Sequence, residues 1–421
     1  MSNKWKYNKL SSLCTKIGDG LHGTPEYFSG TGYFFINGNN LEMGKIEISK
    51  NTKTITETEY KKNYIALSDK SLLLGINGSI GNMAFYNNEK VMLGKSAAYL
   101  NFKTNINTFY YYYFQLKNIQ KYFYDVATGS IIKNLSLQSI QDFYVPVPEE
   151  TEWKNIISTL SSLDSKIELN NRINTELEQM AKTLYDYWFV QFDFPNNEGK
   201  PYKTSGGKMV RNEQLKREIP EMWKVQELSN IISKTGTGLN PRKNFKLGKG
   251  ENYYITIKNV KNGKIIFDES CDKIDDEALK IIDRRSDLQV GDVLFTSIEP
   301  VGITYLIHEK PKNWNINESV FTIKPNYEKI TSEYLFMLLS SDEMRAFTSN
   351  VSAGSIHKGI RHTVLKTFKI PYKDKTITEE FATLIKPILK RIYLIDNENQ
   401  KLEELRDWLL PMLMNGQATV K

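Results

Sequence analysis

The stretch EWKNIISTLSSLDSKIELNNRINTELEQMAKTLYDYWFVQFDF, residues 152–194, decides the fold of this chain. Its apolar residues return mostly at steps of three or four, which keeps one face of a helix apolar; they include Ile156, Leu160, Leu163, Ile167, Leu177, Met180 and Leu184. The stretch contains neither Gly nor Pro, so nothing in it breaks a helix. About 35 helical residues span about 50 Å, which predicts a spacer or a coiled-coil arm.

A second stretch repeats this pattern, and each of its apolar residues lies 225 positions after a counterpart: Phe381, Ile385, Ile388, Ile392, Leu402, Leu405, Leu409 and Met412. Because a helix with an exposed apolar face is unstable in water, the two helices are expected to pack antiparallel around a pseudo-twofold axis. Asn174 and Asn399 share the offset and are predicted to pair near that axis, since Asn in a seam can fix register. The predicted seam consists of Leu160, Leu163, Ile167, Asn174, Leu177, Leu184, Ile385, Ile388, Ile392, Asn399, Leu402 and Leu409.

The ends of the two helices carry local signals. Pro387 is expected to kink or delay the second helix, and Thr376 with Glu379 offers a capping box just upstream of it. An aromatic cluster at the end of the first helix is predicted to pack that end onto a globular part; it comprises Tyr185, Tyr187, Trp188, Phe189, Phe192 and Phe194.

The segments between the helices are duplicated as well. Gly18-x-Gly20-Leu21 matches Gly236-x-Gly238-Leu239 at an offset of 218, the offset that also relates Trp5 to Trp223. Near the end of each segment the offset is 225, because Gly129-Ser130-Ile131-x-Lys133 matches Gly354-Ser355-Ile356-x-Lys358. Several anchors in the same order indicate a tandem duplication with loops of changed length.

The predicted order is therefore globule, helix, globule, helix. Short strand-like runs bounded by Gly and Asn turns, with a helix over residues 108–124, predict an α+β chain made of two α/β globules. The boundaries are a first globule at 1–150, a helix at 151–194, a linker of turn-forming residues at 195–222, a second globule at 223–375, a helix at 376–415 and a tail at 416–421.

Composition sets broad limits on function. A net charge of +7, from 56 basic and 49 acidic residues, permits an anionic partner. Cys14 and Cys271 are the only cysteines and the four histidines are scattered, so neither a disulfide framework nor a metal site is predicted. The polar start lacks a signal peptide, and no run of about 18 apolar residues exists, so a soluble cytoplasmic protein is expected.

Two similar globules at a fixed distance suit duplex DNA, since about 50 Å equals about 15 base pairs. Bases are read by Arg, Lys, Asn, Gln, Ser, Thr and His, and phosphates are met by Lys, Arg and backbone N–H groups. The matched loops place such residues at equivalent positions, and the candidates for DNA contact are His22, Thr24, Ser130, Lys133, Thr235, Thr237, Asn240, Arg242, Lys243, Ser355, His357, Lys358 and Arg361.

Taken together, these strings resemble the specificity subunit of type I restriction–modification enzymes, and the resemblance covers essentially the whole chain. GDGLHGTP (18–25) and TGTGLNPRKNF (235–245) look like parts of two target recognition domains. TELEQMAKTLYDYWFVQFDFPNNEGKPYKTSGGKMV (175–210) looks like the central conserved region of the family, and NQKLEELRDWLLPMLMNGQATV (399–420) looks like the distal one.

The resemblance implies a DNA-recognition role without catalysis. Each target recognition domain would read one half of a bipartite, asymmetric double-stranded DNA site, and the helices would set the gap. The helices would also dock two adenine-N6 methyltransferase subunits, and restriction subunits would join them. The resemblance places S-adenosylmethionine, ATP and Mg²⁺ on those partner subunits and no cofactor on this chain.

Two other classes of function compete with this interpretation. An adenine methyltransferase needs an Asp/Asn-Pro-Pro-aromatic loop for the flipped base, and the chain has no Pro-Pro. A phosphate-binding P-loop fails too, because Glu89 stands where the glycine before Gly94-Lys95-Ser96 is required. A structural adaptor that bridges protein partners through its coiled coil would explain the helices, but not two diverged globules with polar, glycine-rich loops.

Overall fold

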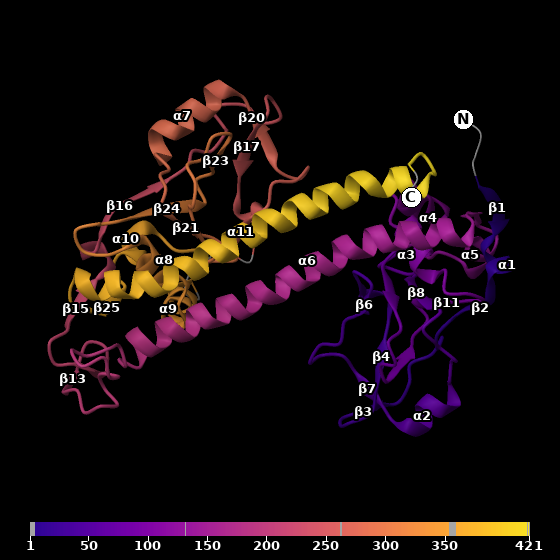
Figure 1. Cartoon of the computed structure of the whole chain (residues 1–421), viewed down its shortest axis with the longest axis horizontal. Coiled ribbons are helices and arrows are strands. Elements are labelled where there is room, and N and C mark those ends of the chain that lie inside the picture. Colours follow the sequence, from indigo (N-terminus) through magenta and orange to yellow (C-terminus); the bar gives the residue numbers. More distant parts are fainter. Residues whose placement is uncertain (1–4, 131, 262, 353–358, 419, 421) are drawn as a thin grey trace. The chain divides into compact units, whose positions relative to one another are not determined.

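The computed structural model describes residues 5–130, 132–261, 263–352, 359–418 and 420 (Figure 1). The chain forms two compact units, residues 1–168 with 400–421 and residues 169–399. We call them the first and second unit. Each contains one globule and parts of the two long helices, which run through both units, so each unit combines segments that lie far apart in the sequence.

The two predicted long helices are present as α6 (Glu150–Tyr185) and α11 (Lys375–Met414), and one turn of π-helix (Asp186–Val190) follows α6. The predicted delay of the second helix by Pro387 is wrong, since α11 begins twelve residues earlier and continues past it. The predicted capping box is wrong as well. Thr376 lies inside the helix, and the Asp374 carboxylate instead accepts a hydrogen bond from the Ile377 N–H at 3.3 Å.

Within each unit the two helices run antiparallel. In the second unit Asn170 donates to the Asn399 side chain at 2.8 Å and Asn174 donates to Asp396 at 2.6 Å. In the first unit Arg406 donates to Asp164 at 3.0 Å. The residue number on α11 therefore falls as the number on α6 rises.

The predicted pair of Asn174 with Asn399 is wrong. Asn399 bonds to Asn170 and Asn171, while Asn174 bonds to Asp396. In an antiparallel pair of repeated helices a residue faces its own counterpart only at one point. The observed contacts put that point near positions 172 and 397, so Asn174 and Asn399 lie on opposite sides of it.

All residues of the predicted seam are buried or half-buried, with Leu160 and Ile385 fully buried. Two further apolar positions of the repeat behave differently, since Met180 is 53% exposed and Leu405 is 42% exposed. They are counterparts at the offset of 225, so the duplication keeps a pair of outward-facing apolar residues as well as the seam.

The first globule is built from two four-stranded sheets. One has the order β2 (Cys14–Asp19), β11 (Ala97–Phe102), β8 (Ser71–Gly75) and β9 (Met83–Phe85), all antiparallel; the other has the order β10 (Val91–Leu93), β4 (Tyr33–Ile36), β7 (Thr54–Ile55) and β3 (Tyr27–Phe28). β1 (Lys6–Lys9) pairs with β12 (Tyr144–Val147), β5 (Leu41–Glu42) pairs with β6 (Lys45–Ile46), and the short helices are α1 (Leu10–Leu13), η1 (Gly38–Asn40), α2 (Glu57–Lys62) and α5 (Leu137–Gln141).

The single helix predicted over residues 108–124 is two helices, α3 (Asn107–Phe114) and α4 (Lys117–Val126). Leu116 between them is extended, with φ −55° and ψ 131°. α3 buries its aromatic side chains almost all round, including Tyr110 and Phe114, whereas α4 buries only Ile119 and Phe123. The break lets each helix turn its own apolar face to the core.

The second globule repeats this plan. Its antiparallel sheet has the order β16 (Ile232–Thr237), β24 (Val320–Pro325), β21 (Val293–Thr296) and β22 (Thr304–Leu306), and its other sheet has the order β20 (Asp272–Ile274), β17 (Asn252–Ile255) and β23 (Trp314–Ile316). β15 (Lys224–Glu227) pairs with β25 (Lys369–Tyr372), and β18 (Val260–Lys261) pairs with β19 (Lys264–Ile265). The helices are η3 (Leu228–Asn230), η4 (Ile257–Asn259), α7 (Asp276–Ser286), α8 (Ser332–Ser340), α9 (Asp342–Ser352) and α10 (His362–Leu365).

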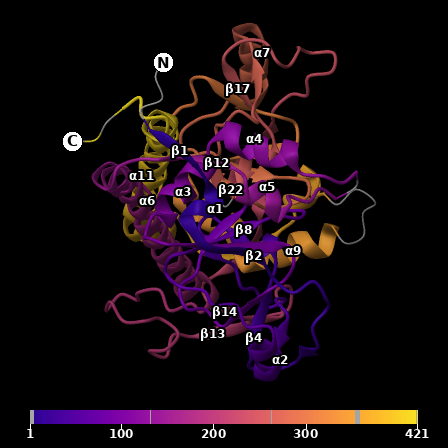
Figure 2. The ribbon, with the colours of Figure 1, turned by 90° about the vertical axis from the view of Figure 1, so that its right-hand side faces the viewer.

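The predicted linker at 195–222 contains structure that its composition did not indicate. β13 (Met209–Asn212) and β14 (Arg217–Pro220) form an antiparallel hairpin, labelled in Figure 2. The Phe194 ring stacks on Tyr202 and Trp223 with centroids 4.9 and 5.2 Å apart. The aromatic cluster after α6 thus anchors this segment to the second unit.

Among the described residues, no helix is long and apolar enough to cross a membrane.

Candidate nucleic-acid interface

The first of the two matched loops follows the first strand of each antiparallel sheet. A Cβ on Gly20 would lie 2.0 Å from the Leu93 carbonyl oxygen, and a Cβ on Gly238 would lie 1.6 Å from the Ile316 carbonyl oxygen. Only glycine lets the backbone approach this closely. The matched glycines therefore hold the loops 18–25 and 236–243 against the end of a neighbouring strand, β10 in the first globule and β23 in the second.

Each loop continues into a second turn through backbone hydrogen bonds. In the first globule the Lys95 N–H donates to the Leu21 carbonyl at 3.0 Å, and the Ile76 N–H donates to the Ser96 carbonyl at 3.0 Å. In the second globule the Gly238 N–H donates to the Asn317 carbonyl at 3.1 Å, and the Ser297 N–H donates to the Ser319 carbonyl at 2.9 Å. The second of these bonds is the same in both globules, whereas the first joins the equivalent loop and turn through different backbone groups.

This chain of turns reaches the second matched loop. The Leu135 N–H donates to the Ile76 carbonyl at 2.8 Å, and Asn77 forms an isolated β-bridge with Asn134. In the second globule the Ile360 N–H donates to the Ser297 carbonyl at 2.8 Å. We call residues 18–25, 76–81, 94–96, 128–130 and 132–134 the first rim, and residues 236–243, 297–302, 317–319 and 359–361 the second rim.

On the first rim the predicted residues are accessible to different degrees. The His22 side chain is 73% exposed, and its Nε2 lies 2.8 Å from Asp19 Oδ2; Thr24 and Ser130 are exposed. Lys133 is engaged on its own globule. It donates to the Tyr124 carbonyl at 2.9 Å, and its ammonium lies 3.8 Å from the centre of the Tyr124 ring.

On the second rim Arg242, Lys243 and Arg361 are exposed, and Asn240 is half-buried. Thr235 and Thr237 lie within β16 and are half-buried, and Arg285 of α7 donates to the Thr237 hydroxyl at 3.3 Å. The predicted residues Ser355, His357 and Lys358 lie outside the described part of the chain.

A half-buried histidine lies behind the second rim. The His362 ring stacks on Phe321 with centroids 3.6 Å apart, and its Nδ1 is buried without a hydrogen-bond partner among the described residues. Burial, followed by the charges of Lys366 and Arg285, lowers the pKa of His362. Its ring thus supports the rim by packing.

Two parts of the rims were missed from the sequence. The turns 94–96 and 317–319 carry exposed charges, Lys95 and Glu318. The loops 76–81 and 297–302 connect the two matched loops. The signal for them was weak, because the repeat offset changes between the two matched loops and the shared glycines Gly81 and Gly302 lie at neither of the two recognised offsets.

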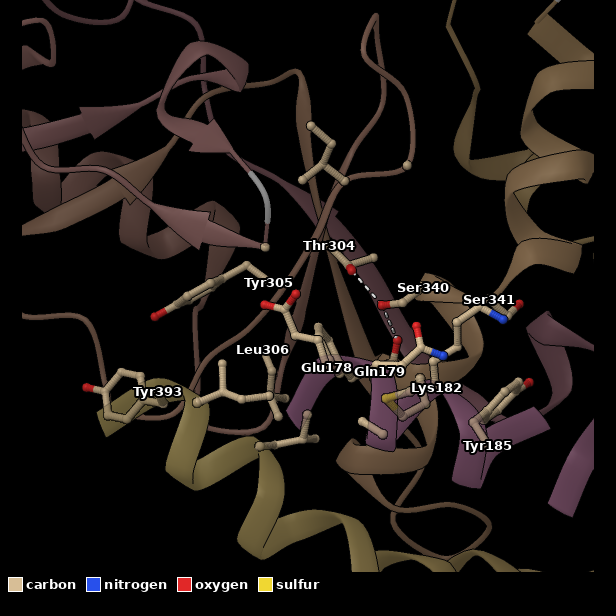
Figure 3. Close-up of a pocket in the computed structure, with 18 of the residues that line it drawn as sticks. Glu178, Gln179, Lys182, Tyr185, Thr304, Tyr305, Leu306, Ser340, Ser341 and Tyr393 are labelled. Carbon is tan, nitrogen blue, oxygen red and sulfur yellow. Dashed lines mark hydrogen bonds between the residues drawn. The ribbon is translucent and has the colours of Figure 1, made fainter. Parts of the chain in front are cut away.

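A cavity of about 660 Å³ lies in the second unit, where α6 and α11 meet β22 (Figure 3). Glu178, Lys182 and Tyr185 of α6 line it, and so do Tyr305 of β22 and Tyr393 of α11. None of the predicted DNA-contacting residues is among its described lining residues.

The matching place in the first unit carries a cluster of bonded polar side chains. There the Tyr112 hydroxyl donates to Asp164 at 2.6 Å, and Arg406 donates to the same carboxylate at 3.0 Å. The counterparts of these three residues at the offset of 225 are Met337, Leu389 and Ala181, which line the cavity. The residues at this place therefore differ between the two copies, whereas both copies share the rims.

A histidine that lines the cavity is expected to make the folding stability depend on pH. His308 stacks on Tyr393 with ring centroids 4.5 Å apart, and burial followed by the charge of Lys390 lowers its pKa to about 4. The unfolded chain keeps a His pKa of about 6.5, so between these values it binds more protons than the folded protein, and stability falls as pH falls through this window.

Between pH 7 and pH 4.5, we expect the His308→Phe variant to lose about 2–3 kcal/mol less stability than the wild type. Urea unfolding of both proteins at pH 7 and pH 4.5 measures the difference. An identical pH dependence in the variant would show that His308 titrates without linkage to folding.

Comparison with known proteins agrees with this duplicated architecture. The model of a family described as the type I restriction modification DNA specificity domain matches residues 3–179 and again residues 220–405. The MjaIX type I restriction enzyme specificity subunit of Methanocaldococcus jannaschii is 24% identical over 99% of this chain and 94% of its own length. The HindI specificity subunit of Haemophilus influenzae is 21% identical over 67% of this chain and 71% of its own length.

The fold has also been seen before. The crystal structure of a type I restriction–modification S subunit from M. genitalium superposes with a TM-score of 0.61, at 15% identity, over 98% of this chain and 96% of that one. The two family matches cover the two globules and most of both helices. The chain therefore belongs to the type I restriction–modification DNA specificity family, with two tandem copies of its domain.

Proposed function

We propose that this chain is the non-catalytic specificity subunit of a type I restriction–modification complex, and that each globule reads one half of a bipartite, asymmetric DNA site. The observation that carries the proposal is the duplicated rim: the same backbone contacts through Gly20 and Gly238 present different side chains in the two globules. A shared frame with different side chains suits two half-sites of different sequence.

The long helices are proposed to set the gap between half-sites and to dock two adenine-N6 methyltransferase subunits. Leu169 and Leu394, which are 43% and 46% exposed, are counterparts at the offset of 225, as are the exposed Met180 and Leu405. On each helix the two apolar residues are eleven positions apart, which is close to three turns. A surface that occurs twice suits two copies of one partner.

The chemistry is assigned to the partners. S-adenosylmethionine is proposed to bind the methyltransferase subunits, and ATP and Mg²⁺ are proposed to serve the restriction subunits. Within the described ranges, no group of three or more His, Cys, Asp or Glu side chains is arranged to hold a metal ion. What this chain contributes is binding and positioning of DNA relative to the methyltransferase.

Sequencing of methylated adenines tests the proposal in cells that express the methyltransferase subunits with and without this chain. The expected result is methylation in one gapped bipartite motif, only when the chain is present. Replacing residues 223–373 by a second copy of residues 5–148 is expected to make the two halves of the motif alike. Equal methylation without the chain, or methylation of a short continuous motif, contradicts the proposal and favours a structural adaptor.

A further inference from the structure

Each rim has at its centre a turn that carries a charged side chain, and the charge has opposite sign in the two globules. Residues 94–96 join β10 to β11, and residues 317–319 join β23 to β24. The middle residue is Lys95 in the first turn and Glu318 in the second, and both are exposed. Because the next residue, Ser96 or Ser319, accepts the same backbone hydrogen bond in each globule, the two side chains leave the same place on the frame.

The loop beside Glu318 is held by a hydroxyl group that has no equivalent in the first globule. The Tyr254 hydroxyl donates to the Leu239 carbonyl at 2.7 Å, which ties β17 to the loop 236–243. Burial and then the nearby charge of Glu318 raise the pKa of Tyr254. The Gly238 N–H of the same loop donates to the carbonyl of Asn317, the residue before Glu318, at 3.1 Å. The counterpart of Tyr254 in β4 is Phe35, which has no hydroxyl. The carboxylate therefore lies beside the loop that carries Asn240 and Arg242.

A carboxylate on a DNA-facing surface needs a specific reason, because it repels the phosphates that dominate affinity. Base edges in the major groove offer few donors that compensate for this repulsion. They are the N4 amino group of cytosine and the N6 amino group of adenine, and Glu or Asp accepts typically from cytosine. A lysine at the same place instead donates to guanine O6 and N7.

We propose that Glu318 reads the N4 amino group of a cytosine in the half-site of the second globule, and that Lys95 occupies the equivalent position on the first. This assignment rests on the proposed function, since it assumes that the rims face DNA. It identifies a specificity-determining residue for one base, with Tyr254 as a positioning residue that acts through the loop 236–243. The opposite charges account for how one frame distinguishes two half-sites at the same position.

Glu318→Gln tests the assignment in the full complex with its methyltransferase subunits. Glutamine favours adenine, so we expect preference at one base of one half-site to shift from cytosine by about tenfold, with the other half-site unchanged. Glu328→Gln is the matched control, because Glu328 is also exposed but follows the far end of β24. Tyr254→Phe is expected to weaken discrimination at the same base without changing the rest of the motif.

The readout is the relative affinity of the purified complex for duplexes with each base of the wild-type motif substituted in turn. Unchanged discrimination in Glu318→Gln, or a loss spread equally over all positions, overturns the assignment while the wild-type gapped motif still upholds the proposed function. Absence of a gapped motif in the wild type contradicts the proposed function itself. Because Glu318 is exposed and glutamine has the same shape, urea unfolding should give wild-type stability for the variant.

Discussion

Gly238→Ala is expected to abolish recognition of the half-site read by the second globule and to destabilise the protein by about 3 kcal/mol. The added Cβ would lie 1.6 Å from the Ile316 carbonyl oxygen and 2.8 Å from the Asn317 carbonyl oxygen. Both are backbone atoms and cannot move aside as a flexible side chain would. Relief of the clash therefore has to displace loop 236–243 or the turn 317–319, which together form the centre of the second rim. Urea unfolding and methylome sequencing measure the two effects.

Gly236→Ala is the matched control on the same loop. A Cβ at Gly236 would find its nearest atom at 3.8 Å, an ordinary van der Waals distance, so near-wild-type stability is expected. Gly20→Ala is expected to reproduce the defect for the other half-site, since its Cβ would lie 2.0 Å from the Leu93 carbonyl oxygen. Equal behaviour of Gly236→Ala and Gly238→Ala would contradict the role given to the close contact.

Phe381→Ala is expected to cost about 3–5 kcal/mol. The Phe381 side chain is fully buried, and its ring lies 5.0 Å from Phe189 and 5.6 Å from Trp188, measured between centroids. Truncation leaves a cavity at the point where α11, the end of α6 and the second globule share one hydrophobic core. Thermal or urea unfolding of the full chain gives the loss of stability.

Leu384→Ala provides the comparison on the same helix, one turn further on. Leu384 is 46% exposed, so its truncation is expected to change stability by less than about 0.5 kcal/mol. A loss in Phe381→Ala no larger than that in Leu384→Ala would mean that the aromatic cluster does not hold α11 to the globule.

The periodic features of the fold could be predicted from the sequence, because they depend on local spacing. The steps of three and four that predict α6 and α11 act within a single helix. The constant offset of 225 that reveals the duplication is visible without any contact. The matched glycines Gly20 and Gly238 were also identified as equivalents, although the carbonyl groups that require them are about 75 residues away in the chain.

Features that depend on contacts between distant segments could not be predicted from the sequence. The pairing of Asn174 with Asp396 follows from where two antiparallel helices cross their common midpoint, which neither helix encodes alone. The break at Leu116 follows from two helices that turn different faces to one core. The turns that carry Lys95 and Glu318 are recognised as parts of the rims only from their backbone hydrogen bonds to the matched loops.

The sequence by itself determined that this chain has two copies of a globule and a long helix, because repetition and helical periodicity are properties of spacing along one chain. Tertiary structure alone decided which residues form each rim, where Glu318 lies beside the loop 236–243, and how α6, α11 and β22 enclose a cavity in the second unit. These features depend on side chains and carbonyl groups that packing brings together from distant segments. The spacing of residues along the chain does not predict that packing.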